Sequence, residues 1–236
     1  MSTEAFSRRL VDAASAPYRA AGRFAWHFAR GKLGSDPVFA GLLQGGVLPD
    51  GQRLLDLGCG QGLLAAWLLA ARRLHAGGDW PATWPPPPRI DRIWGLELMA
   101  QDVARARSAL GAAAEFACGD IRNCDLGCAD AVVILDVLHY IDHAAQEALL
   151  ARIHATLPAG GVFVTRVGDA DGGLRFRFSN WVDQTVALAR GHGFARFHCR
   201  PLRNWIATLE RTGFRVEARP MCAGTPFANV LLVAHA

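Results

Sequence analysis

Residues 54–62 read LLDLGCGQG, an apolar run that ends in Asp56 and then turns through Gly58, Gly60 and Gly62. This order predicts a buried strand, a tight turn and the start of a helix. Glycine has no Cβ, so the backbone of such a turn allows a ligand to approach closely. In open α/β sheets, ligands bind at the carboxyl ends of the strands. The stretch therefore predicts an α/β fold with a ligand site at this turn.

The spacing of the glycines favours one kind of ligand. A dinucleotide fingerprint places its third glycine or alanine three positions beyond the second. Here that position is Leu63, and the spacing is G-x-G-x-G. The pattern favours a nucleoside without pyrophosphate. A dehydrogenase that binds NAD, and a turn with no ligand at all, stay open as alternatives.

The rest of the chain continues the pattern of short apolar runs alternating with helical stretches, which is typical of parallel βαβ units. We expect a doubly wound, seven-stranded, mostly parallel sheet. The predicted strands are residues 53–57, 92–97, 114–118, 131–135, 161–167, 214–221 and 229–234. The predicted helices are residues 62–74, 100–110, 144–157 and 202–212, the last ended by Gly213.

Residues 1–50 do not follow this pattern and predict an N-terminal helical cap, in which Pro37 opens a helix at Asp36. Residues 51–236 form the main domain, with an aromatic lid inserted at about residues 169–200. The segment from Gly77 to Arg89 holds two tryptophans and four consecutive prolines, and predicts an extended loop. It joins the first helix to the second strand, so we expect it at the amino ends of the strands, away from the ligand.

Composition excludes several classes. The chain is 51% hydrophobic and 19% charged, which is a normal globular balance, and its net charge of +4 comes without a dense basic run. A nucleic-acid partner is therefore not favoured. The six cysteines lack paired C-x2-C spacing, so no metal site is expected. The apolar stretches are too short to cross a bilayer and no secretory leader is evident, which predicts a cytoplasmic protein. We expect it to be a monomer or a homodimer.

Residues 54–62 resemble motif I of the class I, S-adenosylmethionine-dependent methyltransferases, and four further landmarks of that family follow in order. They are GLEL at residues 95–98, GDI at residues 119–121, ILDVLHY at residues 134–140 and LPAGGVF at residues 157–163. The resemblance covers about residues 50–236 and implies S-adenosylmethionine as cofactor and S-adenosylhomocysteine as product. The cofactor-binding residues that it implies are Asp56, Gly58, Cys59, Gly60, Gly62, Glu97, Leu98, Asp120, Ile121 and Asp136.

Each acid has an expected role. Glu97 ends the second strand and is able to accept both ribose hydroxyls in charge-assisted hydrogen bonds. It follows Asp56 by 41 positions, further than the usual spacing of about 20, because the proline-rich segment is inserted between them. The resemblance assigns Asp120 and Ile121 to adenine. It places Asp136 at the methionyl end.

A sulfonium methyl group is already activated, so transfer needs mainly an acceptor held in line and the exclusion of water. A base is required only for a protonated nucleophile. His139 is the candidate catalytic residue, because a neutral imidazole beside the cofactor is able to take a phenol, hydroxyl or ammonium proton. A histidine that only lines the pocket is the alternative, and His27 and His198 are weaker candidates.

Aromatic residues suggest the acceptor. The predicted substrate pocket consists of Tyr18, Trp26, His27, Tyr140, Phe178 and Trp181. An apolar pocket of this kind suits a small aromatic or lipid-like molecule. Residues 18–33 are similar to bacterial methyltransferases associated with aryl-polyene pigment lipids, which implies a phenolic head group. Residues 136–139 depart from the acid-Pro-Pro-aromatic signature of enzymes that methylate exocyclic base amines.

We therefore predict transfer of a methyl group to oxygen or carbon of a small aromatic, phenolic or lipid-linked acceptor. Two alternatives stay open. One is methylation of a protein or RNA, which needs a broad basic surface. The other is a non-catalytic module that binds S-adenosylmethionine, since cofactor motifs do not prove turnover.

Overall fold

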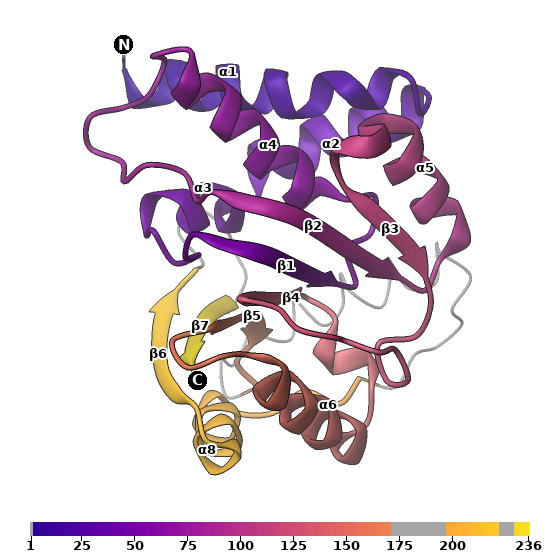
Figure 1. The fold of residues 1–236 in the computed structure, drawn as a ribbon, viewed down its shortest axis with the longest axis vertical. Helices are drawn as coiled ribbons and strands as arrows, with labels where there is room; N and C mark the ends of the chain where they lie inside the picture. Colours follow the sequence, from indigo (N-terminus) through magenta and orange to yellow (C-terminus); the bar gives the residue numbers. More distant parts are fainter. Residues whose placement is uncertain (1, 171–196, 222–228) are drawn as a thin grey trace.

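The computed structural model describes residues 2–170, 197–221 and 229–236. In this part of the chain, seven strands form one sheet in the order β3-β2-β1-β4-β5-β7-β6 (Figure 1). The strands are β1 (Gly51–Leu57), β2 (Ile90–Glu97), β3 (Glu115–Cys118), β4 (Ala131–Leu135), β5 (Val162–Gly168), β6 (Arg215–Pro220) and β7 (Asn229–His235). Neighbours from β3 to β5 pair in parallel, and β7 runs antiparallel to β5 and β6. The predicted mostly parallel sheet is confirmed.

Helices cover both faces of the sheet (Figure 1). The α-helices are α1 (Thr3–Ser15), α2 (Arg23–Ser35), α3 (Pro37–Gln44), α4 (Leu63–Ala76), α5 (Ala100–Leu110), α6 (His143–Thr156) and α8 (Leu202–Thr212). The short 3₁₀ helices are η1 (Ala16–Arg19), η2 (Gly111–Ala113) and η3 (Leu138–Tyr140). Figure 1 shows α1, α2 and α4 beyond one side of the sheet, and α6 and α8 beyond the other. This arrangement is the doubly wound fold that the sequence predicts.

Alternation along the strands explains the two layers. Leu54 belongs to a core cluster with α1 to α5, whereas its neighbour Leu55 belongs to a second cluster with α6 and α8. Val133 and Val132 divide in the same way. Successive side chains of a strand point to opposite faces, so a strand buried on both sides is apolar throughout.

Local signals set the helix ends where the sequence predicts them. Asp36 caps α3, since its side chain accepts a hydrogen bond from the Val38 N–H at 3.0 Å, and Pro37 occupies the first turn. Gly213 ends α8 with a φ of 111°, a conformation that a residue with a Cβ rarely adopts.

The N-terminal helices share a core with the main domain. Phe6, Tyr18 and Leu33 belong to the same apolar cluster as α4 and β1. The proline-rich segment lies at the amino ends of the strands, as predicted, and it packs on this cap. Rings of Trp80 and Trp84 contact Phe6 edge-on at centroid distances of 5.2 and 5.3 Å. The segment therefore anchors α1, a role that the sequence did not indicate.

A buried ion cluster ties the cap to the carboxyl ends of the central strands. Arg166 of β5 is 3% exposed and contacts both carboxylate oxygens of Asp36 in the cap and both of Asp136 after β4. Lys32 of α2 lies 2.7 Å from Asp36 and 3.9 Å from Asp136. Burial alone would raise the pKa of both acids, but the Arg166 guanidinium holds the pKa of each carboxyl below its usual value. Two cations thus balance two anions.

We predict that Arg166→Met lowers the free energy of unfolding by about 3 kcal/mol, because it leaves the buried Asp36 and the half-buried Asp136 with only the partly exposed Lys32 as a countercharge. Chemical denaturation at neutral pH measures this. Arg8→Ala is the control, since Arg8 and its partner Glu4 are 71% and 80% exposed and such a pair contributes little. A loss no greater than that of the control would show that the cluster does not hold the cap.

Candidate functional site

The glycine turn after β1 has the shape of a ligand cradle. Gly58, Gly60 and Gly62 have φ values of 80°, 54° and 75°. A Cβ on Gly62 would lie 2.7 Å from the Phe116 ring, so this glycine permits close helix–sheet contact. A Cβ on Gly60 would meet nothing within 4 Å. Gly60 therefore faces open space, which is where a ligand has room to contact the backbone.

Glu97 lies directly opposite this turn. One carboxylate oxygen accepts a hydrogen bond from the Gly60 N–H at 3.0 Å, and the other accepts from the Met99 N–H at 2.9 Å. Each carboxylate oxygen has a second acceptor position. The side chain is thus oriented by the backbone while it keeps the capacity to accept two ribose hydroxyls, the role predicted for it.

Asp56 and Cys59 contribute from beneath the turn. Asp56 is 4% exposed, and burial, together with the nearby Glu97 carboxylate, raises its pKa to about 7. The Cys59 sulfur lies against β2, because a Cβ on Gly95 would meet it at 2.7 Å. The side chain of Cys59 is buried. Its thiol, which is buried near Asp56, has a raised pKa and stays protonated.

The residues expected to hold adenine lie at the ends of β2 and β3. Glu97 and Cys118 are register partners, and the Gly119 N–H donates to the Glu97 carbonyl at 3.0 Å. Leu98 is 58% exposed, so its side chain is available to an apolar ligand face. Asp120 is already engaged by the Arg122 side chain and N–H, which lower its pKa. An adenine amino group would share that carboxylate with Arg122, a competitor that the sequence did not indicate.

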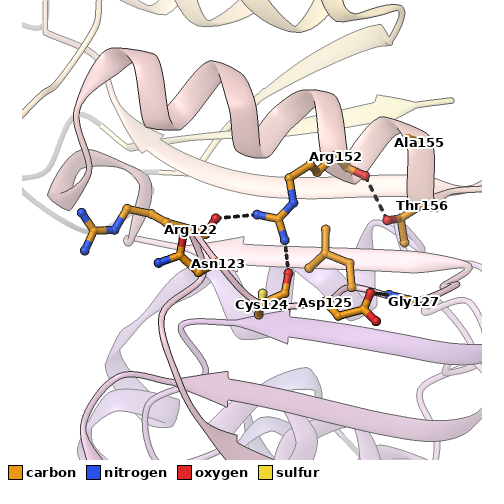
Figure 2. A pocket seen from close by; sticks show the side chains of 9 residues that line it. Arg122, Asn123, Cys124, Asp125, Gly127, Arg152, Ala155 and Thr156 are labelled. Carbon is orange, nitrogen blue, oxygen red and sulfur yellow. Dashed lines mark hydrogen bonds between the residues drawn. The ribbon is translucent and has the colours of Figure 1, made fainter.

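A shallow hollow of about 540 Å³ lies beside the loop that follows Asp120 (Figure 2). Figure 2 shows Arg152 of α6 reaching into this loop, where its guanidinium donates to the carbonyls of Arg122, at 2.7 Å, and of Cys124. The cation of Arg152 is therefore used to hold the loop. We assign the hollow no ligand. The hydrogen bonds of Arg152 fix the segment that carries Asp120 and Ile121.

Asp136 and His139 lie beyond β4, near the cap. Asp136 has a φ of 59°, and its carboxylate is half-buried between Arg166 and Lys32. Its negative charge also acts on the His139 imidazole, whose pKa is lowered by burial to about 4 despite that carboxylate. The Nε2 atom of His139 is buried and has no hydrogen-bond partner in the described part of the chain. His139 is therefore neutral at physiological pH, and its Nε2 has no partner among the residues that the structure describes.

The predicted acceptor pocket is only partly assembled by the described residues. Tyr140 is 40% exposed and stacks beside His139 at a centroid distance of 4.4 Å. Tyr18 is fully buried, and its hydroxyl donates to the Gln61 carbonyl at 2.8 Å, so it supports the glycine turn from below. Trp26 and His27 contact each other on α2 at 4.6 Å. Phe178 and Trp181 lie outside the described residues, as does most of the predicted lid.

Sequence reasoning missed Arg166 and Lys32. A signal for Arg166 was available: an arginine within the apolar strand Val162–Gly168 needs acids nearby, because a buried charge without a partner is costly. Lys32 gave no such signal, since it lies in a polar stretch of α2. Among the described residues, no group of three or more His, Cys, Asp or Glu side chains is arranged to hold a metal ion.

These features fit S-adenosylmethionine. An open face at Gly60, a paired acceptor at Glu97 and an exposed apolar residue at Leu98 lie together at one edge of the sheet. The prediction is that Gly58, Cys59, Gly60 and Gly62 supply backbone around the nucleoside and that Asp136 lies at the methionyl end. The individual contacts with the cofactor remain predictions.

Known proteins support this interpretation at two levels. Carboxy-S-adenosyl-L-methionine synthase of Actinobacillus succinogenes is 29% identical over 155 residues, covering 64% of this chain and 55% of that protein. The chain thus spans about half the length of the curated relatives it matches. An O-methyltransferase family protein from Burkholderia thailandensis has a TM-score of 0.62 at 18% identity, covering 92% of this chain and 61% of that one. Magnesium protoporphyrin IX methyltransferase from Synechocystis, crystallised with S-adenosylhomocysteine, has a TM-score of 0.58 at 19% identity, covering 92% and 91%. At such identities the solved structures establish the fold.

We predict that Glu97→Gln weakens binding of S-adenosylmethionine about 10- to 100-fold, because hydrogen bonds to a charged group contribute roughly 1.5–3 kcal/mol. Calorimetric titration measures the affinity. Glu115→Gln is a matched control on an exposed residue that starts β3. Equal affinity of wild type and Glu97→Gln, or tight binding of NAD by the wild type, would contradict the assignment.

Asp56 predicts a pH dependence of stability. Its pKa is about 7 in the folded chain and about 3.8 when unfolded, so its contribution is full below pH 3.8 and is lost as the pH rises through 7. Relative to Asp56→Asn, the wild type should lose roughly 2–3 kcal/mol between pH 5 and pH 8, because each pKa unit is worth about 1.4 kcal/mol. Urea denaturation of both proteins at the two pH values measures this. A constant difference would show that Asp56 is ionised throughout.

The family comparison agrees with the fold. A methyltransferase domain family matches residues 25–219, which is most of the chain and includes every predicted cofactor residue. The sheet order, the two helical layers and the glycine turn are those of the class I fold of such enzymes. The chain belongs to the methyltransferase domain family, whose cofactor is S-adenosylmethionine.

Proposed function

We propose that this protein transfers the methyl group of S-adenosylmethionine to oxygen or carbon of a small aromatic, phenolic or lipid-linked acceptor. The observation that carries the proposal is the neutral His139 beside the exposed Tyr140, at the same edge of the sheet as the glycine turn. The rings of His139 and Tyr140, with an Nε2 that has no partner among the described residues, suit a flat molecule that bears a single hydroxyl group. The similarity of residues 18–33 to pigment-lipid methyltransferases supports a phenolic head group.

The chain's own residues would hold the cofactor and align the acceptor. When bound, the cofactor supplies an activated methyl group on a sulfonium. Glu97 and the backbone at Gly60 would hold the nucleoside, while Asp136 would bind the methionyl ammonium. His139 would accept the acceptor's hydroxyl proton through Nε2, which is unpartnered in the described residues.

The low pKa of His139 limits what it does. An imidazole with a pKa of about 4 is a weak base, so it does not fully deprotonate a phenol before transfer. It is suited to accept a hydrogen bond and to take the proton as the oxygen–methyl bond forms. Lys32, which is 39% exposed beside Asp136, is the nearby cation able to stabilise developing phenolate charge.

A second product is suggested by the curated relatives, which are named carboxy-S-adenosyl-L-methionine synthases. If this chain shared that activity, the methyl group of the cofactor would lose a proton and gain CO2 from a second, carboxylate-bearing substrate. Lys32 would then be a candidate partner for the new carboxylate. The same assay, repeated with carboxylic acids as candidate donors, resolves the two possibilities by the mass of the cofactor product.

The proposal is tested by incubating the protein with S-adenosylmethionine and a panel of phenols, catechols and long-chain phenolic lipids. Mass spectrometry follows both products. Methylated acceptor with matching S-adenosylhomocysteine supports the proposal. Transfer of the methyl group to added protein or RNA would favour the macromolecular alternative. Tight cofactor binding without any product would favour a non-catalytic module.

We predict that His139→Asn lowers kcat/KM for a hydroxyl acceptor about 100-fold, in the range typical of loss of a general base. The dissociation constant of S-adenosylmethionine should change less than two-fold. His75→Asn, on the exposed surface of α4, is the control. An unchanged rate in His139→Asn would leave His139 as a lining residue only.

Cytoplasmic location and the monomer or homodimer state remain part of this proposal. No helix in the described ranges is long and apolar enough to span a membrane.

A further inference from the structure

Gln146 is a fully buried polar side chain in α6, surrounded by apolar positions of the same helix such as Leu149 and Leu150. Its Nε2 donates to three carbonyls, those of Leu138 at 3.0 Å, Ile141 at 3.1 Å and His198 at 2.8 Å. A primary amide carries two N–H donors, so these three contacts share them. One carboxamide thus joins the turn around η3 to the chain at residue 198.

Arg200 fixes the orientation of that carboxamide. Its Nε donates to the Gln146 Oε1 at 2.8 Å, which commits the amide oxygen to the guanidinium and turns Nε2 toward the carbonyls. The rest of the guanidinium contacts Glu147 at 2.9 Å and Thr208 at 3.3 Å. Arg200 itself is 9% exposed. The donors and acceptors of Gln146 are therefore satisfied in one arrangement and not in its flipped form.

This network reaches His139 directly. The His198 N–H donates to the His139 carbonyl at 2.8 Å, so the chain from residue 197 lies along η3. The Phe197 ring contacts His139 edge-on at 5.1 Å and Tyr140 at 5.2 Å. Gln146 binds the Leu138 carbonyl in η3 and the His198 carbonyl, so it holds the backbone on both sides of the contact between His139 and Phe197. Phe197 therefore contributes to the burial of the imidazole.

A purely structural role does not require these residues. Replacing a buried polar network with well-packed apolar side chains is often neutral or stabilising. What apolar side chains do not supply is a single fixed register between two backbone segments, which directional hydrogen bonds specify. Gln146 joins the segments that carry His139 and Phe197.

We propose that Gln146 and Arg200 are positioning residues that hold Phe197 against His139 and so set the orientation and dry surroundings of this imidazole toward the acceptor. The inference rests on the proposed function only for the role of His139 toward the acceptor. The hydrogen bonds of Gln146 and Arg200, which we call the Gln146 clamp, do not depend on that function.

Gln146→Met tests the proposal, because methionine has similar volume but neither donates nor accepts as the amide does. We expect the pKa of His139, followed by NMR titration, to move from about 4 toward its ordinary value of 6.5 as water reaches the ring. The value of kcat/KM for the acceptor should fall about 10- to 100-fold, as for a misplaced catalytic group. The dissociation constant of S-adenosylmethionine should stay within two-fold, since the clamp does not touch Glu97.

Thr208→Val is the matched control. It removes a 3.3 Å contact to the same guanidinium while leaving the Gln146 clamp in place, so it should leave the His139 titration unchanged. If Gln146→Met does not fold, Arg200→Lys gives the second measurement, because lysine keeps the charge and loses the contact with Oε1. An unchanged His139 titration in a folded variant of either residue overturns the proposal. If the wild type methylates no acceptor, the proposed function fails, and the NMR titration still decides the positioning role.

Discussion

The ion cluster around Arg166 is the interaction on which the arrangement of the site depends. It joins three parts of the chain that are distant in sequence: the cap at Asp36, the end of β4 at Asp136 and the middle of β5. A buried guanidinium is tolerated only where its donors and charge are met, so the two acids have little freedom to move. Asp136 adopts a positive φ, which is uncommon for a residue with a Cβ, and its bidentate contact with Arg166 holds it there. The cap, the sheet and the expected methionyl site are thus one rigid unit.

The edge of the sheet separates two electrostatic environments. On the β1 and β2 side, Asp56 and Glu97 lie close together with no cation contacting either carboxylate among the described residues, which is why the pKa of Asp56 rises. On the β4 and β5 side, the acids are balanced by Arg166 and Lys32. The neutral His139 lies on the balanced side, next to aromatic rings.

The fold was predictable from the sequence because its signals are local. Glycines at 58, 60 and 62, alternating apolar strands and the caps at Asp36 and Gly213 each act within a few residues. The position of Glu97 opposite the glycine turn was also predictable, since parallel strands bring their carboxyl ends together. The buried place of Tyr18 and the ion pair of Asp120 with Arg122 were not. These depend on side-chain partners, which a pattern of residue types does not specify. The clamp at Gln146 is harder still, because its partners are backbone carbonyls.

The base of the predicted lid is closed by the described residues. Asp169 accepts a hydrogen bond from the Leu202 N–H at 2.9 Å, and the Ala170 N–H donates to the Arg200 carbonyl at 3.4 Å. The chain that leaves β5 is therefore hydrogen-bonded to the chain that enters α8. A segment tied at its base behaves as an interchangeable insert, because doubling the length of such a loop costs only about 0.6 kcal/mol in closure entropy. A longer or shorter segment at this position would therefore leave the sheet, the edge at Gly60 and Glu97 and the Arg166 cluster in place.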